Sequence, residues 1–252
     1  MELTAGLRKM IVSLSETKHR HSLKLFKAEG TKCVLDTFYA FKARYLIATQ
    51  QWIDSNIEKI PLSDVEVIKA SPAEMGRVSA MSNPAPVVAV YEIPDQTFDI
   101  SKVKGQLSLA LDCVQDPGNL GTIIRTADWF GIRDIFCSKD TADVYNPKVV
   151  QATMGGISRV KVHYLDLCEF IARLDDTPVY GTFLDGQDIS TTQLTDNGLI
   201  VMGNEGKGVS KNIAELVSHR LTIPSFPKGE PTSESLNVAV ATAIVVSKFR
   251  LK

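Results

Sequence analysis

Residues 107–130 read LSLALDCVQDPGNLGTIIRTADWF, and this stretch decides the fold of the C-terminal part of the chain. The apolar run Leu107–Val114 predicts a buried strand, and Gly118–Phe130 predicts a helix after the turn at Pro117-Gly118. Strand-like and helical segments alternate from there to the end of the chain. Such alternation is typical of an α/β domain with a mainly parallel sheet.

The later elements are expected at regular intervals. Strands are predicted at Asp134–Cys137, Lys161–Tyr164, Val179–Leu184, Leu199–Met202 and Arg220–Ile223, and helices at Pro147–Met154, Leu167–Leu174, Ser210–Val217 and Ser235–Phe249. The last helix is apolar on nearly all sides, so we expect it to be buried in the core or against another subunit. Ser233 or Ser235 is expected to cap it.

The N-terminal region also mixes helical and strand-like patterns. Helices are predicted at Leu7–Ser15, Val34–Ala40 and Pro72–Ser82, and strands at Tyr45–Ala48 and Pro86–Tyr91. The polar, aperiodic stretch that follows predicts a linker. We therefore expect a first domain at residues 1–92, a linker at 93–105 and a second domain at 106–252.

Composition limits the classes of protein. The chain has 252 residues, of which 44% are hydrophobic and 23% charged, so it can bury a sizeable core. No apolar run approaches the ~20 residues that span a bilayer, and no signal core follows Met1, so we expect a cytoplasmic protein without a membrane segment. The four cysteines lack C-x-x-C spacing, so neither a disulfide framework nor a metal site is expected.

The charges are unevenly distributed. The net charge of −1 argues against sequence-blind coating of nucleic acid, but residues 1–60 hold ten Lys or Arg against six Asp or Glu. Such a region could meet phosphates, and a solvated surface explains it equally well. The segment Lys18–His21 is predicted to be basic surface.

Three loops at predicted strand ends hold the candidate site, because ligands bind at the carboxyl edge of parallel sheets. The first is Asp112–Ala127, with Asn119 and Arg125; alone, Arg125 would more often be a surface ion-pair partner. The second, Gly203–Gly208 (GNEGKG), matches neither the Walker motif nor G-x-G-x-x-G, so a structural turn explains it equally well.

The third loop runs from Ile223-Pro224 through a Pro- and Gly-rich excursion to Ser235-Leu236-Asn237. Asn237 lies among apolar residues and should therefore be hydrogen-bonded, for which a capping role is sufficient. Each loop alone is ambiguous, and the order and spacing of the three are much more specific.

Together the segments Asn119-x-Gly121-x-x-x-Arg125-x-Ala127, Gly203-x-Glu205-x-x-Gly208 and Ile223-Pro224…Ser235-Leu236-Asn237-Val238-x-x-Ala241 resemble the three motifs of the SpoU (TrmH-like) RNA 2′-O-ribose methyltransferases of the SPOUT superfamily. The resemblance covers roughly residues 107–252. It implies a SPOUT-type parallel sheet, a deep C-terminal trefoil knot, S-adenosylmethionine as cofactor, and a homodimer formed through this domain.

The resemblance also implies site residues. Those that match active-site positions are Asn119, Arg125, Glu205, Ser235 and Asn237, and those that match the cofactor pocket are Met202, Gly203, Gly208, Ile223, Pro224 and Leu236. The segment Ser225–Glu234, which includes Phe226 and Lys228, is longer than the usual family spacing and could reshape the cofactor or RNA entrance. Upstream, residues 25–30 and the strand at 84–90 are similar to the small α/β, ribosomal-protein-like substrate-binding domain that precedes many such enzymes; a small dimer-supporting domain is the alternative.

The resemblance gives the motif-one arginine, Arg125, the task of accepting the ribose proton. A guanidinium pKa above about 12 makes that assignment awkward. We therefore expect Arg125 to bind the RNA phosphate and stabilise the developing oxyanion. Asn119 would orient Arg125 or the nucleotide, Glu205 would hold hydrogen-bond donors around the site, and Ser235 and Asn237 would fix the loop and the substrate.

Several functions remain open at this point. Methylation of a ribose 2′-hydroxyl in structured RNA, with ribosomal RNA ahead of transfer RNA, is the leading hypothesis. The alternatives are a transfer RNA 2′-O-methyltransferase, a base-methylating SPOUT enzyme, and a non-catalytic RNA-binding or assembly factor of the same fold. The target nucleotide leaves no code in the sequence.

Overall fold

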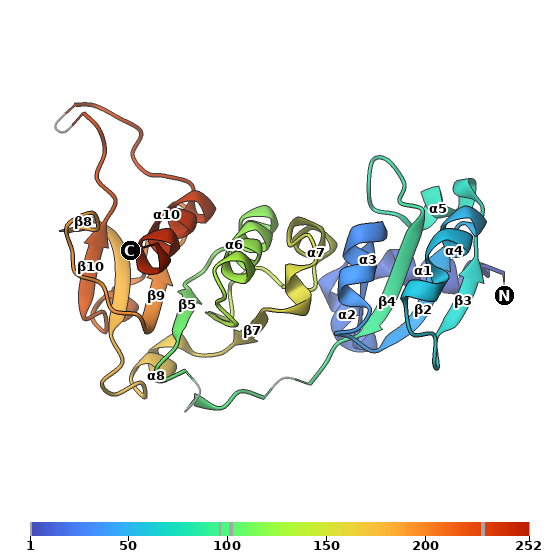
Figure 1. Ribbon diagram of the computed structural model, residues 1–252, viewed down its shortest axis with the longest axis horizontal. Helices are drawn as coiled ribbons and strands as arrows, with labels where there is room; N and C mark the ends of the chain where they lie inside the picture. The colour runs from blue at the N-terminus through green and yellow to red at the C-terminus, as the bar shows by residue number, and fades with distance from the viewer. Residues whose placement is uncertain (1, 96, 101–102, 228–229, 252) are drawn as a thin grey trace. The chain divides into compact units, whose positions relative to one another are not determined.

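A computed structural model describes residues 2–95, 97–100, 103–227 and 230–251. The chain forms two compact units, one of residues 1–95 with 143–159 and one of residues 96–142 with 160–252 (Figure 1). Residues 143–159, with helix α7 (Pro147–Ala152), belong to the first unit, where α7 packs against strand β1. The bounds 1–92, 93–105 and 106–252 stay a prediction.

The first unit is built on a four-stranded sheet in the order β1-β4-β2-β3. The strands are β1 (Leu25–Glu29), β2 (Ala43–Ala48), β3 (Glu66–Lys69) and β4 (Val87–Glu92). Strand β4 is antiparallel to both of its neighbours and β2 is parallel to β3, so the carboxyl ends of β1, β2 and β3 share one edge with the start of β4.

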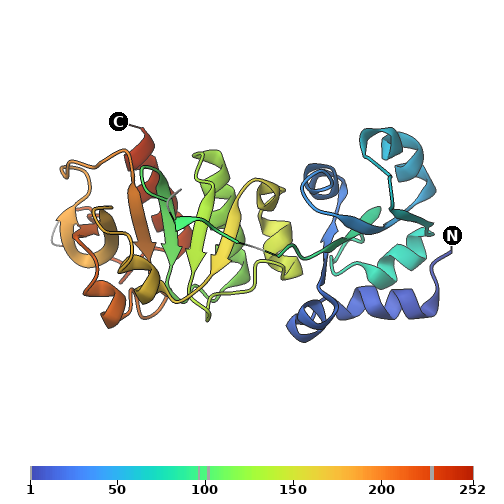
Figure 2. The ribbon, with the colours of Figure 1, turned by 90° about the horizontal axis from the view of Figure 1, so that it is seen from below.

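Helices cover both faces of this sheet (Figure 2). They are α1 (Ala5–Ser13), α2 (Thr17–Leu23), α3 (Thr31–Thr37), α4 (Gln50–Asn56), the 3₁₀ helix η1 (Ile57–Lys59) and α5 (Pro72–Val78). On one face, Ile11 and Leu14 with Met75 and Val78 pack against the apolar side chains of the strands. The sheet therefore lies between two helical layers.

The prediction that Lys18–His21 forms basic surface is wrong at Arg20. The Arg20 side chain is fully buried. Its guanidinium donates to the carbonyls of Leu14 and Ser15 at 2.9 and 3.0 Å, and Nη2 lies 2.6 Å from Asp143 Oδ2. Asp143 lies more than 100 residues further along the chain, which is why local sequence could not reveal the pairing.

The second unit has a six-stranded sheet in the order β10-β8-β9-β5-β6-β7, and every pair is parallel. The strands are β5 (Leu107–Leu111), β6 (Asp134–Cys137), β7 (Lys161–Tyr164), β8 (Val179–Asp188), β9 (Gly198–Met202) and β10 (His219–Thr222). The predicted α/β fold with a parallel sheet is confirmed.

Helices also lie on both faces of this sheet (Figure 1). They are α6 (Pro117–Trp129), α8 (Leu167–Ile171), α9 (Lys211–Ala214) and α10 (Val238–Arg250); the 3₁₀ helix η3 (Gly156–Ser158) belongs to the first unit. Helices α6 and α10 pack against each other, whereas α8 and α9 share a core with β8 and β9. Among the described residues, no helix is long and apolar enough to cross a membrane.

Helix α10 begins later than predicted. Its N-cap is Asn237, whose Oδ1 accepts from Ala239 N at 3.0 Å and Val240 N at 3.3 Å, so neither Ser233 nor Ser235 caps the helix. Both serines are exposed. Within the single chain Val240 of this helix is 50% exposed, so burial of the whole helix against another subunit stays a prediction.

Candidate active site

The first two motif loops follow neighbouring parallel strands, β5 and β9, and meet at the carboxyl edge of the sheet. The backbone of Asp112 donates to Met202 O at 2.9 Å, and the Asp112 carboxylate accepts from Ser210 N at 2.7 Å. Asn204 Nδ2 donates to Cys113 O at 2.7 Å. The ends of β5 and β9 and the loops that follow them are therefore joined by hydrogen bonds on both sides of the glycine-rich segment.

The glycine-rich loop closes on itself. Asn204 and Gly208 exchange two backbone hydrogen bonds of 2.9 Å, and Asn204 Oδ1 accepts from the backbone of Gly206 and Lys207. A Cβ on Gly203 would collide with the backbone of Gly208, and Gly208 has φ +69°. Both glycines are thus required by the turn itself, and they are not by themselves evidence for a cofactor.

A chain of side-chain hydrogen bonds joins all three motifs. Glu205 Oε1 accepts from Asn119 Nδ2 at 3.1 Å, and Asn119 Oδ1 accepts from Asn237 Nδ2 at 2.9 Å. Glu205 also accepts from the backbone N–H groups of Gln115 and Asp116. Three residues that are up to 118 positions apart therefore lie in one connected network, which fixes the orientation of both amides.

Arg125 lies outside that network. It is exposed on α6, two turns after the loop, and its guanidinium has no hydrogen-bond or ion-pair partner among the residues that the structure describes. Asn119 does not orient it within those residues, since both ends of the Asn119 amide are bonded elsewhere. The guanidinium fork is available for a phosphate or another anion.

The predicted cofactor residues have the chemistry of a nucleoside pocket. Met202 and Gly203 are buried beneath the loop, Ile223 and Pro224 are half-buried, and Leu236 is 47% exposed. Among the described residues of 223–236, the only backbone hydrogen bond within the segment joins Glu230 to Pro227. Apolar side chains beside free main-chain N–H and C=O groups fit an adenosine and a thioether chain.

Two further residues of the predicted site need separate mention. Ser235 is exposed and makes no hydrogen bond with any described residue. Lys228, which the long third loop includes, lies outside the described residues. The structure therefore brings together Asn119, Glu205 and Asn237, but it does not bring Ser235 or Arg125 into contact with them.

Sequence reasoning missed three residues that build the site. Asp112 holds Ser210, Asn204 holds the turn and Cys113, and Asp116 caps α6 through Asn119 N at 2.7 Å. Asp116 could have been found, because an Asp before Pro-Gly is a typical N-cap signal. Asp112 and the Asn204–Cys113 contact act across 90 or more residues and left no local signal, whereas the turn that Asn204 makes with Gly206 and Lys207 is local.

The thiol of Cys113, in the first motif loop, is not an activated nucleophile. Burial, with a smaller contribution from the carboxylates of Asp140 and Asp112, raises the pKa of Cys113. Nucleophilic cysteines require the opposite shift. Among the described residues, no group of three or more His, Cys, Asp or Glu side chains could hold a metal ion.

Asn237→Asp should separate the capping role of Asn237 from its amide contact. A carboxylate oxygen still accepts from Ala239 and Val240, so α10 should lose less than about 0.5 kcal/mol of stability. The other oxygen would face Asn119 Oδ1 without a hydrogen to share. We expect methyl-group transfer to fall about tenfold or more, with the thermal unfolding midpoint nearly unchanged.

The contrasting variant is Asn237→Ala, which also removes the cap and should cost about 1 kcal/mol of stability. Activity assays and thermal melts of both variants provide the check. Equal activity of Asn237→Asp and the wild type would show that the Asn119–Asn237 contact has no part in the reaction.

Comparisons with known proteins match both parts of the chain. Residues 106–247 match the model of the SpoU rRNA Methylase family. Residues 9–89 match the model of the MRM3-like substrate binding domain. The first match contains all three motif loops, and it covers more than half of the chain.

Individual relatives match over nearly the whole length. A 23S rRNA (guanosine(2553)-2′-O)-methyltransferase from Bacillus subtilis is 29% identical over 242 residues, which cover 94% of this chain and 93% of that protein. The solved structure of a TrmH-family protein from Porphyromonas gingivalis has 38% identity and a TM-score of 0.89, covering 100% of this chain and 99% of that one. An AdoMet-bound rRNA methyltransferase from Sinorhizobium meliloti has 29% identity and a TM-score of 0.85, with coverage of 100% and 96%.

Proposed function

We propose that this chain, which belongs to the SpoU rRNA methylase family, transfers the methyl group of S-adenosylmethionine to a ribose 2′-hydroxyl of ribosomal RNA. The observation that carries the proposal is the hydrogen-bonded chain from Glu205 through Asn119 to Asn237, which assembles the three motifs beside the exposed Arg125. The relative from Bacillus subtilis, named for 2′-O-methylation of 23S rRNA, supports ribosomal RNA as the substrate class.

S-Adenosylmethionine, when bound, supplies an electrophilic methyl group on a positively charged sulfur, so positioning contributes much of the catalysis. The residues suited to hold it are Met202, Gly203, Gly208, Ile223, Pro224 and Leu236. They offer apolar side chains and main-chain groups, and no metal is required of them. Their placement at the carboxyl edge of a parallel sheet agrees with the usual position of ligands in such folds.

We assign to Arg125 the contacts with the target ribose and its phosphate. Its guanidinium, which has no partner among the described residues, can bind the phosphate next to the target nucleotide and can stabilise negative charge on the 2′-oxygen as the hydroxyl proton passes to solvent. Glu205 keeps the Asn119 amide oriented, and Asn237 holds the other end of that amide. Ser235, exposed just before the helix cap, is free to contact the RNA or the cofactor.

The proposal has a direct test. RNA from cells with and without the protein would be digested with nuclease P1 and examined by mass spectrometry, with 2′-O-methyl sites mapped along each RNA. A site lost from ribosomal RNA supports the proposal, and a site lost only from transfer RNA assigns the alternative substrate. If methylation in cells were unchanged and S-adenosylmethionine gave no heat of binding to the pure protein, the chain would instead be a non-catalytic RNA-binding factor.

For the fold, we propose the deep trefoil knot in the second unit and a ribosomal-protein-like architecture for the first. The knot is supported by the path of the chain after β10, an edge strand: α10 returns to pack against α6, which follows the central strand β5. The match of residues 9–89 to a substrate-binding domain model supports an RNA-binding role for the first unit.

We also propose a homodimer formed through the α6–α10 surface. Three large apolar side chains are exposed there: Trp129 at 85%, Val240 at 50% and Leu251 at 71%. The ends of the two helices are adjacent, because Arg250 Nε donates to Phe130 O at 3.1 Å. Trp129 and Leu251 lie at these adjacent ends and Val240 lies on the first turn of α10, so exposed apolar groups occur along the helix pair, which supports an interface there.

Trp129→Glu should weaken this dimer. A buried tryptophan at an interface typically contributes about 2 kcal/mol or more, so we expect the dimer dissociation constant to rise by about thirtyfold or more. Sedimentation velocity over a concentration series measures the change. Leu184→Glu is the matched control, since Leu184 is 80% exposed on β8 of the same unit. An equal effect of both variants, or none from Trp129→Glu, would place the interface elsewhere.

A further inference from the structure

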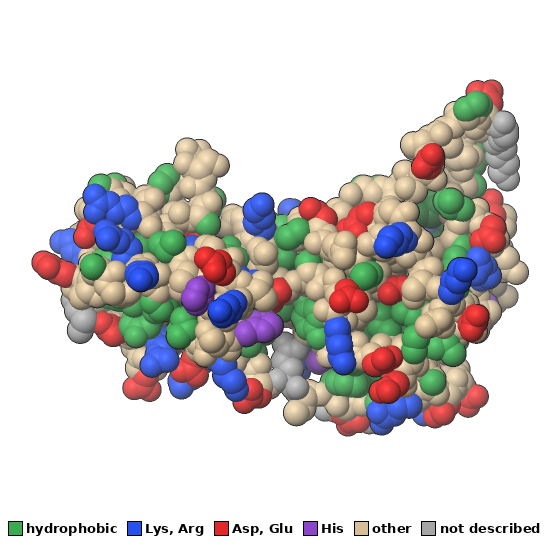
Figure 3. All heavy atoms as spheres, turned by 180° about the vertical axis from the view of Figure 1, so that it is seen from behind, with side chains coloured by type: hydrophobic (Ala, Val, Ile, Leu, Met, Phe, Trp, Pro, Cys, Tyr) green, Lys and Arg blue, Asp and Glu red, His purple; other side chains and the backbone are tan. Residues whose placement is uncertain are grey.

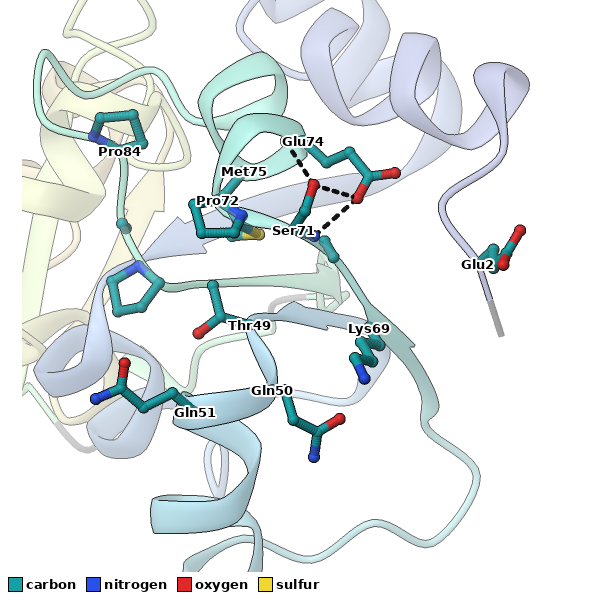
Figure 4. A pocket seen from close by; sticks show the side chains of 13 residues that line it. Glu2, Thr49, Gln50, Gln51, Lys69, Ser71, Pro72, Glu74, Met75 and Pro84 are labelled. Atoms are coloured by element: carbon teal, nitrogen blue, oxygen red, sulfur yellow. Dashed lines mark hydrogen bonds between the residues drawn. The ribbon is translucent and has the colours of Figure 1, made fainter.

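A hollow opens at one edge of the four-stranded sheet in the first unit. Three segments line it: Thr49–Gln51 after β2, Lys69–Met75 after β3, and Pro84–Pro86 before β4, with Glu2 at its side (Figure 4). Its volume is about 1050 Å³. The segments are joined at the sheet edge, because Thr49 N donates to Pro86 O and Ala70 N to Ala48 O, each at 2.9 Å.

The lining combines flat apolar surfaces with uncharged polar groups. Pro72, Pro84 and Pro86 are exposed along the hollow, above the buried side chain of Met75. Gln51 contributes an exposed amide that has no partner among the described residues. The amide of Gln50 donates to Asp54 at 2.6 Å, which leaves its oxygen as an acceptor.

The charges of the hollow do not suit a cluster of phosphates. Lys69 is the single cation among the described residues that line it, while Glu2 and Glu74 are acidic. The Glu74 carboxylate is engaged by Ser71, whose backbone N and Oγ both lie 2.7 Å from Oε2, and these hydrogen bonds lower the pKa of Glu74. Acidic and basic side chains are interspersed on the face of the molecule that Figure 3 shows. A neutral, planar ligand with hydrogen-bonding edges fits this lining better than an anion.

A buried ion pair between Lys27 and Glu29 holds the turn at Ser79–Ala80, in the segment that leads to the hollow. Lys27 and Glu29 are 1% and 5% exposed, and Lys27 Nζ lies 2.8 Å from Glu29 Oε1. Lys27 also donates to Val78 O at 3.0 Å, and Glu29 accepts from Ser79 Oγ and Ala80 N. Buried ion pairs contribute little net stability. We therefore interpret this pair as fixing the position of the turn at Ser79–Ala80.

We propose that this hollow is a binding site for one unpaired nucleobase of the RNA substrate. The inference rests on the proposed function, because the ligand is the RNA that the second unit would methylate. Proteins read single-stranded RNA by packing splayed-out bases against side chains, most often aromatic rings, and by hydrogen bonds to base edges. Here the C–H faces of the proline rings provide an apolar surface for the base, Gln50 and Gln51 meet the base edge, and Lys69 reaches the adjoining phosphate.

The test uses the full chain and a short, mixed-sequence, fluorescein-labelled single-stranded RNA, measured by fluorescence anisotropy. Gln51→Ala should weaken binding about tenfold, the loss expected when a hydrogen-bonding partner of a bound base is removed. Lys69→Gln should weaken binding by less and reduce its salt dependence. The blunt duplex of the same sequence should bind more weakly and should not respond to Gln51→Ala, since its bases are paired.

Lys42→Gln is the matched control. Lys42 lies at the opposite edge of the same sheet, where it pairs with Glu92, and it is exposed like Lys69. Its loss should change the affinity by less than about twofold. Gln51→Ala binding as tightly as the wild type would overturn the site, and so would an equal loss in Lys42→Gln and Lys69→Gln.

A second measurement does not depend on variants. The same RNA carrying 4-thiouridine would be cross-linked to the wild-type chain, and the cross-linked peptides would be identified by mass spectrometry. Cross-links within residues 49–51, 69–75 or 84–86 support the site, and cross-links confined to other segments overturn it. Methylation of ribosomal RNA is scored separately: if it persists without these cross-links, only the inference fails, and if the cross-links form without methylation, only the proposed function fails.

Discussion

Arg125→Lys is expected to lower the rate of methyl transfer by about 10²–10³, the loss typical when one charge-stabilising donor is removed from an active site. Lysine keeps the positive charge but loses the planar pair of donors that binds a phosphate and a neighbouring oxygen together. The Arg125 guanidinium is exposed and has no partner among the described residues, so its replacement should leave the fold intact. The effect should therefore fall on RNA binding and methyl transfer and not on folding.

Two measurements isolate that effect. Isothermal titration with S-adenosylmethionine should give the wild-type affinity, because Arg125 makes no hydrogen bond or ion pair with the described residues of the loops that carry the cofactor residues. Single-turnover methyl transfer to ribosomal RNA, in which the 2′-oxygen takes the methyl group from sulfur, S-adenosylhomocysteine leaves and the hydroxyl proton passes to solvent, should show the loss in rate. Near-wild-type turnover with the cofactor bound normally would remove Arg125 from the reaction.

Arg133→Lys is the matched control for this variant. Arg133 follows α6 in the same unit, and its side chain is 57% exposed at 3.7 Å from Asp128. A surface arginine of this kind contributes little to stability, and nothing ties it to the motif loops. A rate loss in Arg133→Lys equal to that in Arg125→Lys would indicate a general weakening of RNA binding by the lost arginines.

The parallel sheet was predictable because its signal is local. Runs such as Leu107–Leu111 and Leu199–Met202 are apolar on both faces, as buried parallel strands are, and turn residues separate them from helices. The sequence of β1 gives no such signal. Its five residues are all buried, yet two of them, Lys27 and Glu29, are charged and neutralise each other inside the fold. A pattern rule cannot assign a strand whose polar side chains pair within the core.

The site shows the same division between local and distant contacts. The order of the three motifs identified Asn119, Glu205 and Asn237, which the structure joins by hydrogen bonds. The contacts of Asn204 with Cys113 and of Asp112 with Ser210 were not predictable, because these partners lie 90 or more residues away and any polar residue would look the same in sequence. The N-cap of α10 was predicted to be a serine because Asn237 is surrounded by apolar residues in the sequence and was placed inside the helix. The structure shows that the helix begins directly after Asn237.

The largest effect on stability is expected from Arg20→Met. Methionine retains an apolar stem of similar volume but removes the guanidinium, so Asp143 Oδ2 and the carbonyls of Leu14 and Ser15 lose the hydrogen bonds that it donates, while Asp143 Oδ1 still accepts from Tyr145 N. Breaking a buried ion pair in this way costs about 3–5 kcal/mol. We expect the free energy of unfolding of the first unit to fall by that amount.

The chain offers a built-in probe for this measurement. It has two tryptophans: Trp52 is 4% exposed in α4 of the first unit, whereas Trp129 is 85% exposed in the second. Burial changes on unfolding therefore report mainly on Trp52, and urea titration followed by fluorescence tracks the first unit. Lys18→Met is the control, since Lys18 is exposed on the same helix, and it should change stability by less than about 0.5 kcal/mol.

A double-mutant cycle assigns the loss to the pair itself. Asp143→Asn keeps an oxygen for the backbone N–H of Tyr145, which Asp143 Oδ1 accepts at 2.9 Å, while it removes the negative charge that faces Arg20. The double variant should be more stable than the sum of the two single losses predicts, because neither buried charge is then left alone. A loss below about 1 kcal/mol in Arg20→Met, or strict additivity in the cycle, would show that residues 143–159 are held to the first unit by apolar packing and not by this ion pair.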